Sequence, residues 1–386
     1  MNQVRIGLIG AGFLAQTRLR NYTRTRGAAL SAVAASKADS ATAFAAGAHG
    51  SGLVAGDELQ AMDSVEALLA REDIDVVDLC VPNPIHRSLT EQAAAAGKHV
   101  ICTKPLVGFP GKTADDPGDP TPDAQAMVDA CAAAGVHLMY AENWIYAPSI
   151  RKAAALHAAS DGVLLEMRGW EAHSGSHAEY AKAWKTAGGG ALMRLGSHPI
   201  GAMLQLKEEE GMRLHGKPTA VSAVTATTAD LTRTAGLTEA NTRIATGWQD
   251  VENWGMAVLH FADGSRGIVY GSDNCLGGMQ SRLELTSSNA QYQCNLSPND
   301  LLRSYAHDVT TFGQEYLMEK ADTHAGWNTP IPDEDWSSGQ LGMCQAFVAD
   351  LQAQRAPLAG GALGVAVMQV LAAAYRSART GSMVEL

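Results

Sequence analysis

The feature that most constrains this chain is a glycine pattern near its start, Gly10-x-Gly12-x-x-Ala15. It follows an apolar, strand-like stretch at residues 4–9 and precedes a helical stretch at about residues 13–25. In such a strand–helix turn, Gly10 permits the tight bend, Gly12 lets backbone approach a pyrophosphate, and Ala15 allows close packing. The helix N-terminus adds N–H donors and the positive end of a dipole. The pattern therefore predicts a bound dinucleotide.

Strand-like and helical stretches alternate through the first 145 residues, which is typical of a doubly wound, parallel Rossmann sheet. Further strands are predicted at residues 28–35, 74–81, 100–103 and 136–140, and helices at 38–46, 65–70, 86–96 and 124–134. Residues 108–122, rich in Pro, Gly and Asp, are predicted to be an inserted loop.

The pattern changes near residue 146, where a second α/β domain is predicted to begin. Strands are expected at 163–170, 220–227, 253–261, 265–272 and 281–287, and helices at 151–159, 342–353 and 362–379. An Asp-Gly turn at residues 261–265 indicates a hairpin. We therefore predict a Rossmann domain over 1–145. A domain over 146–386 would carry a large, mostly antiparallel open sheet, and its last helices could pack back on the first domain.

Charge and composition narrow the possible partners. The net charge of −11 disfavours nucleic acid, because an acidic surface repels phosphate backbones. No apolar run reaches the ~20 residues that a membrane helix needs, and the first residues do not resemble a secretory signal. The six cysteines form no C-x-x-C pair and no zinc spacing. We expect a cytoplasmic protein with reduced thiols, without a membrane partner and without a metal.

The end of the second predicted strand bears on which dinucleotide binds. A carboxylate normally stands there to hold the ribose 2′-hydroxyl of NAD. This chain has Ala35-Ser36-Lys37 instead, and Ser36 and Lys37 could bind a 2′-phosphate. Asp39 lies inside the next helix, where it could serve as an N-terminal helix charge. The sequence leaves NAD and NADP both open and leans to NADP.

Four further motifs carry a resemblance when taken in order. They are Val81-Pro-Asn-Pro-Ile-His86, Ala96-Gly-Lys-His-Val100, Thr103-Lys-Pro-Leu106 and Gly188-Gly-Gly-Ala-Leu-Met-Arg-Leu-Gly-Ser-His198. Together with the glycine pattern they resemble the glucose-fructose oxidoreductase, inositol dehydrogenase and rhizopine-catabolism family of oxidoreductases, over nearly the whole chain. The resemblance implies a Rossmann domain followed by an α/β domain whose open sheet supports homo-oligomers, dimers or tetramers. It also implies a small sugar or polyol as substrate.

The resemblance assigns functional roles to two residues, Lys104 and His198. Lys104 matches the lysine of a Glu-Lys-Pro motif, and His198 matches a catalytic histidine. A partly desolvated lysine near the positive nicotinamide ring would have a lowered pKa and could accept or share the hydroxyl proton. His198 could act as base or relay, and the alternative is a helix-start histidine with a purely structural bond.

Two positions depart from the family pattern. Thr103 stands where Glu is usual, which changes what orients Lys104. Arg194 stands where many members have the Asp partner of the histidine, so a carboxylate is replaced by a fixed cation. On a helix, Arg194 and His198 would share one face. The guanidinium could grip a carboxylate, sulfonate or phosphate, or pair structurally with Glu142 or another acid.

A subgroup that acts on glycosides is the nearer resemblance. It rests on Tyr140-Ala-Glu-Asn-Trp-Ile-Tyr146, His173-Ser-Gly-Ser-His177 and Gly326-Trp-Asn-Thr-Pro-Ile-Pro-Asp-Glu-Asp-Trp336. Aromatic faces suit sugar rings, although large aromatics are more often core residues. His173 and His177 flank a Gly/Ser loop, where substrate contact is favoured over a metal. Asn83 is expected to cap the helix beginning near His86, and the resemblance implies that it also lines the nicotinamide pocket.

The predicted site is therefore as follows. Proton transfer is assigned to Lys104, His198 and Tyr146. Cofactor binding is assigned to Gly10, Gly12, Phe13, Leu14, Ala15, Ser36, Lys37, Pro82, Asn83, His86 and Lys104. Substrate binding is assigned to Lys104, Glu142, Trp144, His173, His177, Trp184, Arg194 and His198.

Two functions remain open from the sequence. The first is an NAD(P)-dependent dehydrogenase of a sugar, polyol or glycoside, with a net change in NAD(P)H. The alternative is a redox-neutral glycosidase that oxidises a ring hydroxyl transiently, eliminates the anomeric group, adds water and returns the hydride. This alternative could act on an anionic glycoside, and it would leave no net NADH.

Overall fold

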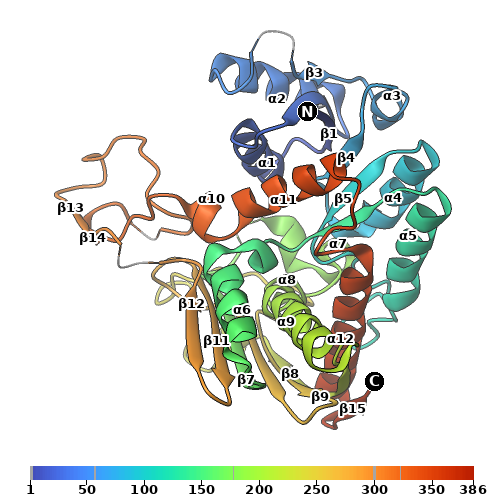
Figure 1. The fold of residues 1–386 in the computed structure, drawn as a ribbon. Helices are drawn as coiled ribbons and strands as arrows, with labels where there is room; N and C mark the ends of the chain where they lie inside the picture. Colours follow the sequence, from blue (N-terminus) through green and yellow to red (C-terminus); the bar gives the residue numbers. More distant parts are fainter. Residues whose placement is uncertain (1–2, 56–57, 177, 299–300, 322) are drawn as a thin grey trace. The chain divides into compact units, whose positions relative to one another are not determined.

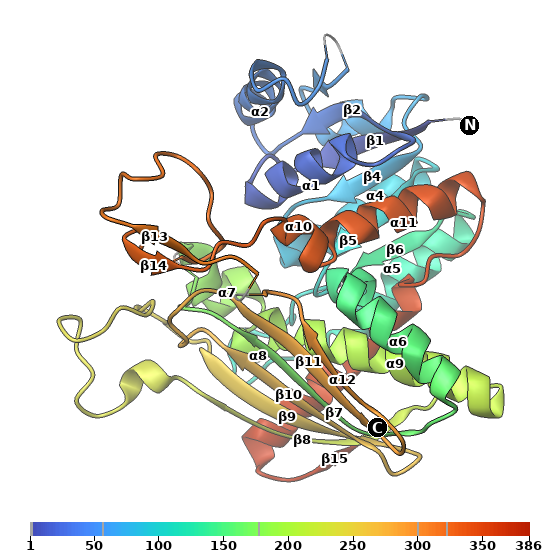
Figure 2. The same cartoon turned by 60° about the vertical axis from the view of Figure 1, so that its left-hand side comes forward.

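The computed structural model describes residues 3–55, 58–176, 178–298, 301–321 and 323–386. The chain divides into two compact units, each assembled from three separate segments. Unit 1 comprises residues 1–108, 120–146 and 339–368, and unit 2 comprises 109–119, 147–338 and 369–386. Figures 1 and 2 label the elements of both.

Unit 1 is built on a six-stranded, wholly parallel sheet in the order β3-β2-β1-β4-β5-β6. The strands are β1 (Val4–Ile9), β2 (Ala28–Ala34), β3 (Gln60–Ala61), β4 (Val76–Leu79), β5 (His99–Thr103) and β6 (Leu138–Ala141). The order reverses between β1 and β4, and ligands bind outside the carboxyl ends of the strands at such a switch point. The predicted Rossmann sheet is confirmed.

Most helices of unit 1 follow the strands as expected, but one is formed by residues 340–352, which were predicted to belong to the second domain. The helices are α1 (Phe13–Thr23), α2 (Ala38–Gly50), α3 (Val65–Leu69), α4 (His86–Ala95), α5 (Thr121–Ala133) and α11 (Gln340–Gln352), with short 3-10 turns η1 (Asn83–Ile85) and η2 (Asn143–Tyr146). Asp39 lies in the first turn of α2, as predicted. The cap position of α4 is Ile85, without a capping side-chain bond, so the prediction that Asn83 caps this helix is wrong.

A buried ion pair joins three elements of unit 1. The Arg18 side chain of α1 forms an ion pair through Nε with Asp78 Oδ2 of β4 at 2.8 Å, and its Nη1 donates a hydrogen bond to Gln340 Oε1 of α11 at 2.7 Å. Tyr22 adds a hydroxyl bond of 2.7 Å to the same Asp78 oxygen. The helix that begins at the glycine pattern is therefore fixed to the central strand and to a helix more than 300 residues later in the chain.

Unit 2 contains a seven-stranded sheet in the order β12-β11-β7-β10-β9-β8-β15, antiparallel except for β7 with β10. Its strands are β7 (Leu164–Ala172), β8 (Val221–Ala229), β9 (Trp254–Phe261), β10 (Arg266–Ser272), β11 (Gln280–Ser287), β12 (Gln291–Asn295) and β15 (Val384–Glu385). This confirms the predicted mostly antiparallel sheet. The β9–β10 hairpin turns at Gly264, whose φ is +93°.

One face of this sheet is covered and the other is open. Helices α6 (Pro148–Ser160), α8 (Ala191–Arg194) and α9 (Ser197–His215) contact the sheet, together with short turns η3 (Glu179–Lys182) and α7 (Trp184–Ala187) nearby. The 19-residue α9 had not been predicted. In Figure 2 the helices lie behind the strands, and no helix of the described residues covers the front face. The remaining elements of unit 2 are η4 (Leu231–Arg233), β13 (Ser304–Ala306), β14 (Gly326–Asn328) and α10 (Glu334–Ser337).

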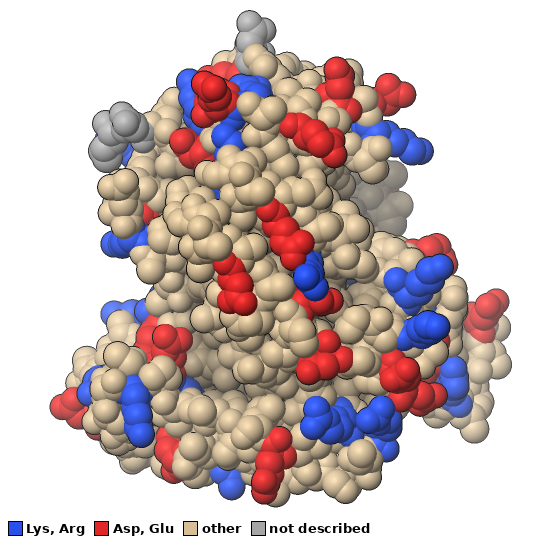
Figure 3. Space-filling model, turned by 90° about the vertical axis from the view of Figure 1, so that its right-hand side faces the viewer, with Lys and Arg blue, Asp and Glu red and all other residues tan. Residues whose placement is uncertain are grey.

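The last long helix, α12 (Gly361–Thr380), runs from unit 1 into unit 2. By length and composition it could cross a membrane, contrary to the expectation from sequence that no stretch is long enough. However, 67% of its most apolar window is buried inside the protein, which is usual for a core helix. On the face drawn in Figure 3, acidic and basic side chains are interspersed over a mostly uncharged surface.

Candidate functional site

The glycine pattern occupies the turn between β1 and α1, at the switch point of the unit 1 sheet. Gly10 has φ +116°, and a Cβ there would lie 2.2 Å from the Cys80 carbonyl oxygen. Gly12 is different, because a Cβ at this position would meet nothing within 4 Å. Gly12 is also the N-cap residue of α1 and has no side chain with which to cap the first turn. These residues fit a pyrophosphate, which needs open space and uncapped N–H donors.

The other predicted cofactor residues lie around the same edge of the sheet. Phe13 is 70% exposed at the start of α1, whereas Ala15 is buried against the sheet. Ser36 and Lys37 follow β2 with Ala35 between, and both are exposed. Pro82 is exposed in the loop that follows β4. The carboxyl ends of β1, β2 and β4 thus carry most of the residues that sequence reasoning assigned to the dinucleotide.

His86 lies beneath this edge and has no exposed surface. Its Nδ1 is 3.0 Å from the Leu106 carbonyl oxygen, and its Nε2 is 3.0 Å from that of Val81. Burial lowers the pKa of His86, so the imidazole favours its neutral form. The ring joins the loop after β4 to the loop after β5, which carries Lys104, and these contacts are those of a residue that positions both loops.

Thr103, which replaces the usual glutamate, is the last residue of β5. Its hydroxyl donates to the Leu79 carbonyl oxygen at 3.3 Å and lies 3.3 Å from His86 Nε2. Lys104 follows at the carboxyl end of the strand and is half-buried. The departure from the family pattern therefore replaces a carboxylate beside the lysine with a buried, uncharged hydrogen-bonding group.

Three of the predicted site residues lie inside unit 1 near η2. Glu142 is fully buried, and its Oε1 accepts a bond of 3.1 Å from the Trp144 backbone N–H. Trp144 is buried as well. The Tyr146 hydroxyl accepts a bond of 3.0 Å from the Ala359 backbone N–H, and its ring packs edge-on against Phe347. Packing explains these positions, and substrate or proton-transfer roles for them stay predictions.

Trp184 has a similar environment inside unit 2. Its ring packs against Phe109 and Tyr375, and its indole N–H donates to the Gly111 carbonyl oxygen at 3.1 Å. Only 1% of its surface is exposed. These contacts are those of a core aromatic, and sugar stacking by Trp184 stays a prediction without support from its packing.

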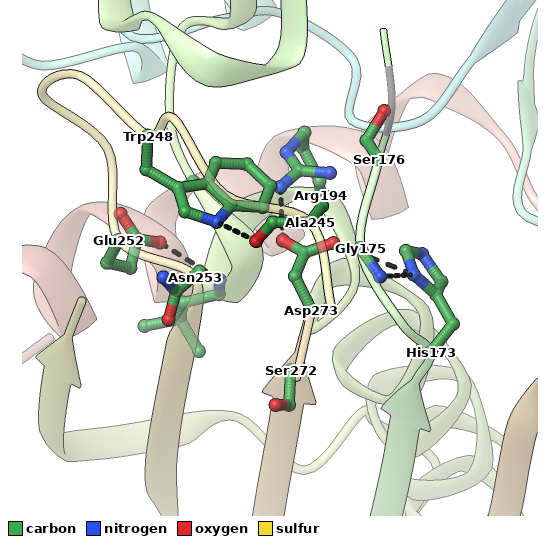
Figure 4. Close-up of polar contacts among 12 residues, drawn as sticks. His173, Gly175, Ser176, Arg194, Ala245, Trp248, Glu252, Asn253, Ser272 and Asp273 are labelled. Carbon is green, nitrogen blue, oxygen red and sulfur yellow. Dashed lines mark hydrogen bonds and ion pairs between the residues drawn. The ribbon is translucent and has the colours of Figure 1, made fainter. Parts of the chain in front are cut away.

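A second cluster lies at one end of the unit 2 sheet, where the parallel strands β7 and β10 both end (Figure 4). His173 follows β7, and Asp273 follows β10. The His173 Nδ1 accepts a bond of 2.9 Å from the Gly175 backbone N–H, so its proton is on Nε2. His177 lies outside the described residues, and within them no group of three His, Cys, Asp or Glu side chains could hold a metal.

Arg194 belongs to this cluster. Its Nη2 donates to Asp273 Oδ2 at 2.5 Å, and its guanidinium lies 5.6 Å from the centre of the Trp248 ring (Figure 4). The carboxylate partner is therefore Asp273. Neither Asp273 nor Trp248 was predicted, and only their place after β10 and in the long β8–β9 connection sets them apart in the sequence.

Arg194 and His198 do not share one helix, contrary to the expectation from their spacing. Arg194 ends α8, and His198 is the second residue of α9, with Leu195 and Gly196 between the two helices. A Cβ at Gly196 would lie 2.3 Å from the Leu192 carbonyl oxygen, so the tight junction requires glycine. His198 is buried, and its backbone N–H donates to the Leu195 carbonyl oxygen.

Beneath α8 lies a buried carboxyl group that the sequence did not single out. Glu252 accepts hydrogen bonds from the Tyr375 hydroxyl at 2.7 Å and from the Leu192 backbone N–H at 3.0 Å. The Tyr375 hydroxyl also accepts from the Gly190 backbone N–H at 3.1 Å. Burial raises the pKa of Glu252 to about 7, although these bonds and Arg194 lower it.

Family models match both parts of the chain. Residues 4–142 match an oxidoreductase family described as having an NAD-binding Rossmann fold, and residues 153–293 match the GFO/IDH/MocA C-terminal domain. The chain belongs to this oxidoreductase family. The resemblance drawn from the motifs is thereby confirmed, as is a nicotinamide dinucleotide as the cofactor class.

Individual members of the family show how far the likeness extends. D-xylose 1-dehydrogenase (NADP(+)) 2 of Haloferax volcanii is 27% identical over 84% of this chain and 85% of its own length. D-apiose dehydrogenase of Paraburkholderia graminis is 38% identical, but the match spans only 37% of this chain and 33% of that protein. GenD2 from gentamicin A biosynthesis, solved with NAD, has a TM-score of 0.79 and 26% identity over 100% of this chain and 97% of its own.

Proposed function

We propose that this family member moves a hydride between a nicotinamide dinucleotide and a hydroxyl group of a sugar or polyol. The observation that carries the proposal is the open Gly12 position at the N-terminus of α1, beside the switch point of a parallel sheet. The relatives named above support the substrate class, because two of them are named as dehydrogenases of pentoses.

Lys104 and His198 are the groups that we propose for proton transfer. When bound, the nicotinamide would take or give the hydride, and the hydroxyl proton needs a separate acceptor. Lys104 stands at the carboxyl end of β5, where parallel sheets place ligands, and is half-buried. His198 stands at the start of α9 in unit 2, four residues after Arg194 in sequence.

Ser36 and Lys37 are the residues that we propose for recognition of the adenosine ribose. Both are exposed in the loop after β2, and no carboxylate stands in residues 35–37 to hold a 2′-hydroxyl. A serine hydroxyl and a lysine ammonium suit a 2′-phosphate, so NADP is the proposed cofactor. Replacing Ser36 with Asp should then shift the ratio of kcat/KM from NADP towards NAD, measured with the same sugar.

The open face of the unit 2 sheet is the surface that we propose for homo-oligomerisation. Trp254 and Tyr270 pack edge-on in neighbouring strands, and both remain partly exposed. Met256 and Ile268 continue this face, with Met256 36% exposed. A contiguous apolar strip of this kind commonly marks a subunit interface. Light scattering should show a dimer or larger species that Ile268→Lys dissociates.

The function is tested by following the nicotinamide absorbance with NAD or NADP and a panel of pentoses, hexoses, polyols and glycosides, with product analysis alongside. We expect absorbance to change in step with an oxidised or reduced sugar. Lys104→Met should abolish turnover while the dinucleotide still binds. Cleavage of a glycoside without a net absorbance change would refute the dehydrogenase proposal and favour the redox-neutral glycosidase. A Lys104→Met variant within a few-fold of wild type would remove that residue from proton transfer.

A further inference from the structure

The cluster at the end of the unit 2 sheet is held in place by its own backbone. The Asp273 N–H donates to the Asn253 carbonyl oxygen at 2.8 Å, and the His173 N–H donates to that of Ser272 at 3.0 Å. Asn274 adds a side-chain bond of 2.8 Å to the same Asn253 oxygen. Figure 4 shows these segments meeting around Arg194. These bonds fix the backbone of Asp273, from which its carboxylate extends towards Arg194.

The Arg194 guanidinium is held at one end and over one face. Asp273 accepts a hydrogen bond from Arg194 Nη2, and the guanidinium lies over the Trp248 ring. The Trp248 indole N–H in turn donates to the Ala245 carbonyl oxygen at 3.0 Å. Arg194 keeps 14% of its side chain exposed, whereas Asp273 has none. A planar guanidinium fixed in this way presents its N–H groups in one direction, which suits recognition of oxygen atoms on a ligand.

The buried pair adds little net stability to the fold, because the free energy lost by removing two charges from water is about as large as the attraction between them. A hydrophobic pair would serve packing at least as well. Burial raises the pKa of Asp273, although Arg194 lowers it. Arg194 ends α8, directly before the two-residue junction that leads to α9 and His198. This place in the chain points to a role for the pair other than packing.

We propose that Arg194 is the sugar-recognition group of unit 2, that Asp273 and Trp248 position it, and that it selects an uncharged sugar over the corresponding sugar acid. This inference rests on the proposed function. The selection follows from charge: Asp273 already neutralises Arg194, so a ligand carboxylate would find no net positive partner in the pair. A hydroxyl or ring oxygen still accepts hydrogen bonds from the guanidinium.

Further ionisable groups lie near the pair. Glu252 lies within electrostatic range of Arg194, on the side towards α8. Lys320 lies within range of Asp273, and its Nζ donates to the Gly175 carbonyl oxygen at 3.1 Å. Lys320 adds a cation, and Glu252, whose pKa burial raises to about 7, supplies an offsetting carboxylate only above that pH. The comparison of sugar and acid is therefore made at about pH 8. The expected preference for uncharged sugars is therefore set by the pair itself.

The test compares the best sugar from the panel with its uronic acid in wild type, Asp273→Asn and Arg194→Gln. Wild type should prefer the sugar. Asp273→Asn should leave an unbalanced guanidinium, lower kcat/KM for the sugar about tenfold or more, mainly through KM, and raise the ratio of acid to sugar by a similar factor. Arg194→Gln should lower kcat/KM for the sugar without raising kcat/KM for the acid. Asp161→Asn, at an exposed residue of unit 2, is the matched control.

Two results would overturn the inference: a wild type that prefers the uronic acid, or an Asp273→Asn variant that loses the same factor of kcat/KM for both ligands, so that the ratio of acid to sugar is unchanged. If Asp273→Asn fails to fold, the Arg194→Gln/Asp273→Asn double variant removes both charges and should lose the discrimination. The dinucleotide dissociation constant should stay within about twofold of wild type throughout. If wild type oxidises no sugar, the proposed function fails. Quenching of Trp248 fluorescence by sugar or acid, compared with Trp248→Phe, then tests recognition separately.

Discussion

Replacing Glu252 with Gln should change how the stability of the protein depends on pH. The pKa of Glu252 is raised from 4.5 to about 7 by burial. In the unfolded chain the carboxyl group loses its proton near its ordinary pKa, whereas in the folded chain it keeps that proton until about pH 7. Fewer protons are then bound in the unfolded state, so the free energy of unfolding falls as pH rises between these two values.

The size of this effect follows from the shift. One pKa unit corresponds to about 1.36 kcal/mol, so the full shift is worth about 3 kcal/mol of lost stability above pH 7. Below pH 4.5 both states hold the proton and the loss vanishes. The glutamine side chain of the Glu252→Gln variant cannot ionise, yet its amide oxygen can still accept from the Tyr375 hydroxyl and the Leu192 N–H. The variant should therefore lack this part of the pH dependence.

The assay is urea unfolding of wild type and Glu252→Gln at intervals from about pH 4.5 to about pH 8. We expect the free energy of unfolding of the variant, relative to that of wild type, to rise steadily across that range, by about 3 kcal/mol in total. Glu239→Gln, at an exposed position of unit 2, controls for the loss of a carboxylate in general. Parallel curves for wild type and Glu252→Gln would show that Glu252 ionises without cost in the folded protein, and the reasoning from its burial would be wrong.

Three other predictions follow from the packing. Gly12→Ala should keep wild-type stability, because its Cβ meets no protein atom, but calorimetry should show at least about tenfold weaker dinucleotide binding, because the Cβ fills space left for the pyrophosphate. Gly10→Ala should unfold at a lower temperature, because its Cβ meets backbone. Asp78→Asn should cost about 3–5 kcal/mol in urea unfolding by stranding buried Arg18, and a loss below about 1 kcal/mol would contradict this. Tyr375→Phe should cost about 1–3 kcal/mol, since Glu252 loses a donor, and an unchanged midpoint would count against that bond.

The fold of unit 1 was readable from the sequence because its signals are local. Apolar strands, helices and glycine turns alternate at short intervals, and each is specified by neighbouring residues. Unit 2 was harder. Helix α9 begins with Ser197-His198-Pro199 and contains Gly211, which local propensity disfavours, but proline is tolerated in a first turn and packing on the sheet supplies the stability.

The candidate site was less accessible than the fold. Gly10, Gly12 and Lys104 stand in recognisable motifs, so their positions could be predicted. Asp273 lies 79 residues from Arg194 in sequence, and their segments meet because α8 packs against β9 and β10. Side-chain burial could not be predicted either, because no signal in the neighbouring sequence shows that the ring of Trp184 lies in a core.

The discontinuity of unit 1 has a consequence for biosynthesis. Helix α11, some 200 residues after β6, contacts α1 and β1 and supplies the Gln340 bond to Arg18. A nascent chain that has emerged only as far as residue 145 therefore lacks the helix that packs on α1 and β1 in unit 1. The dinucleotide helix would wait, incompletely packed, while all of unit 2 except its last segment is translated. A cofactor present in the cell could then load only late, after nearly the whole chain has been made.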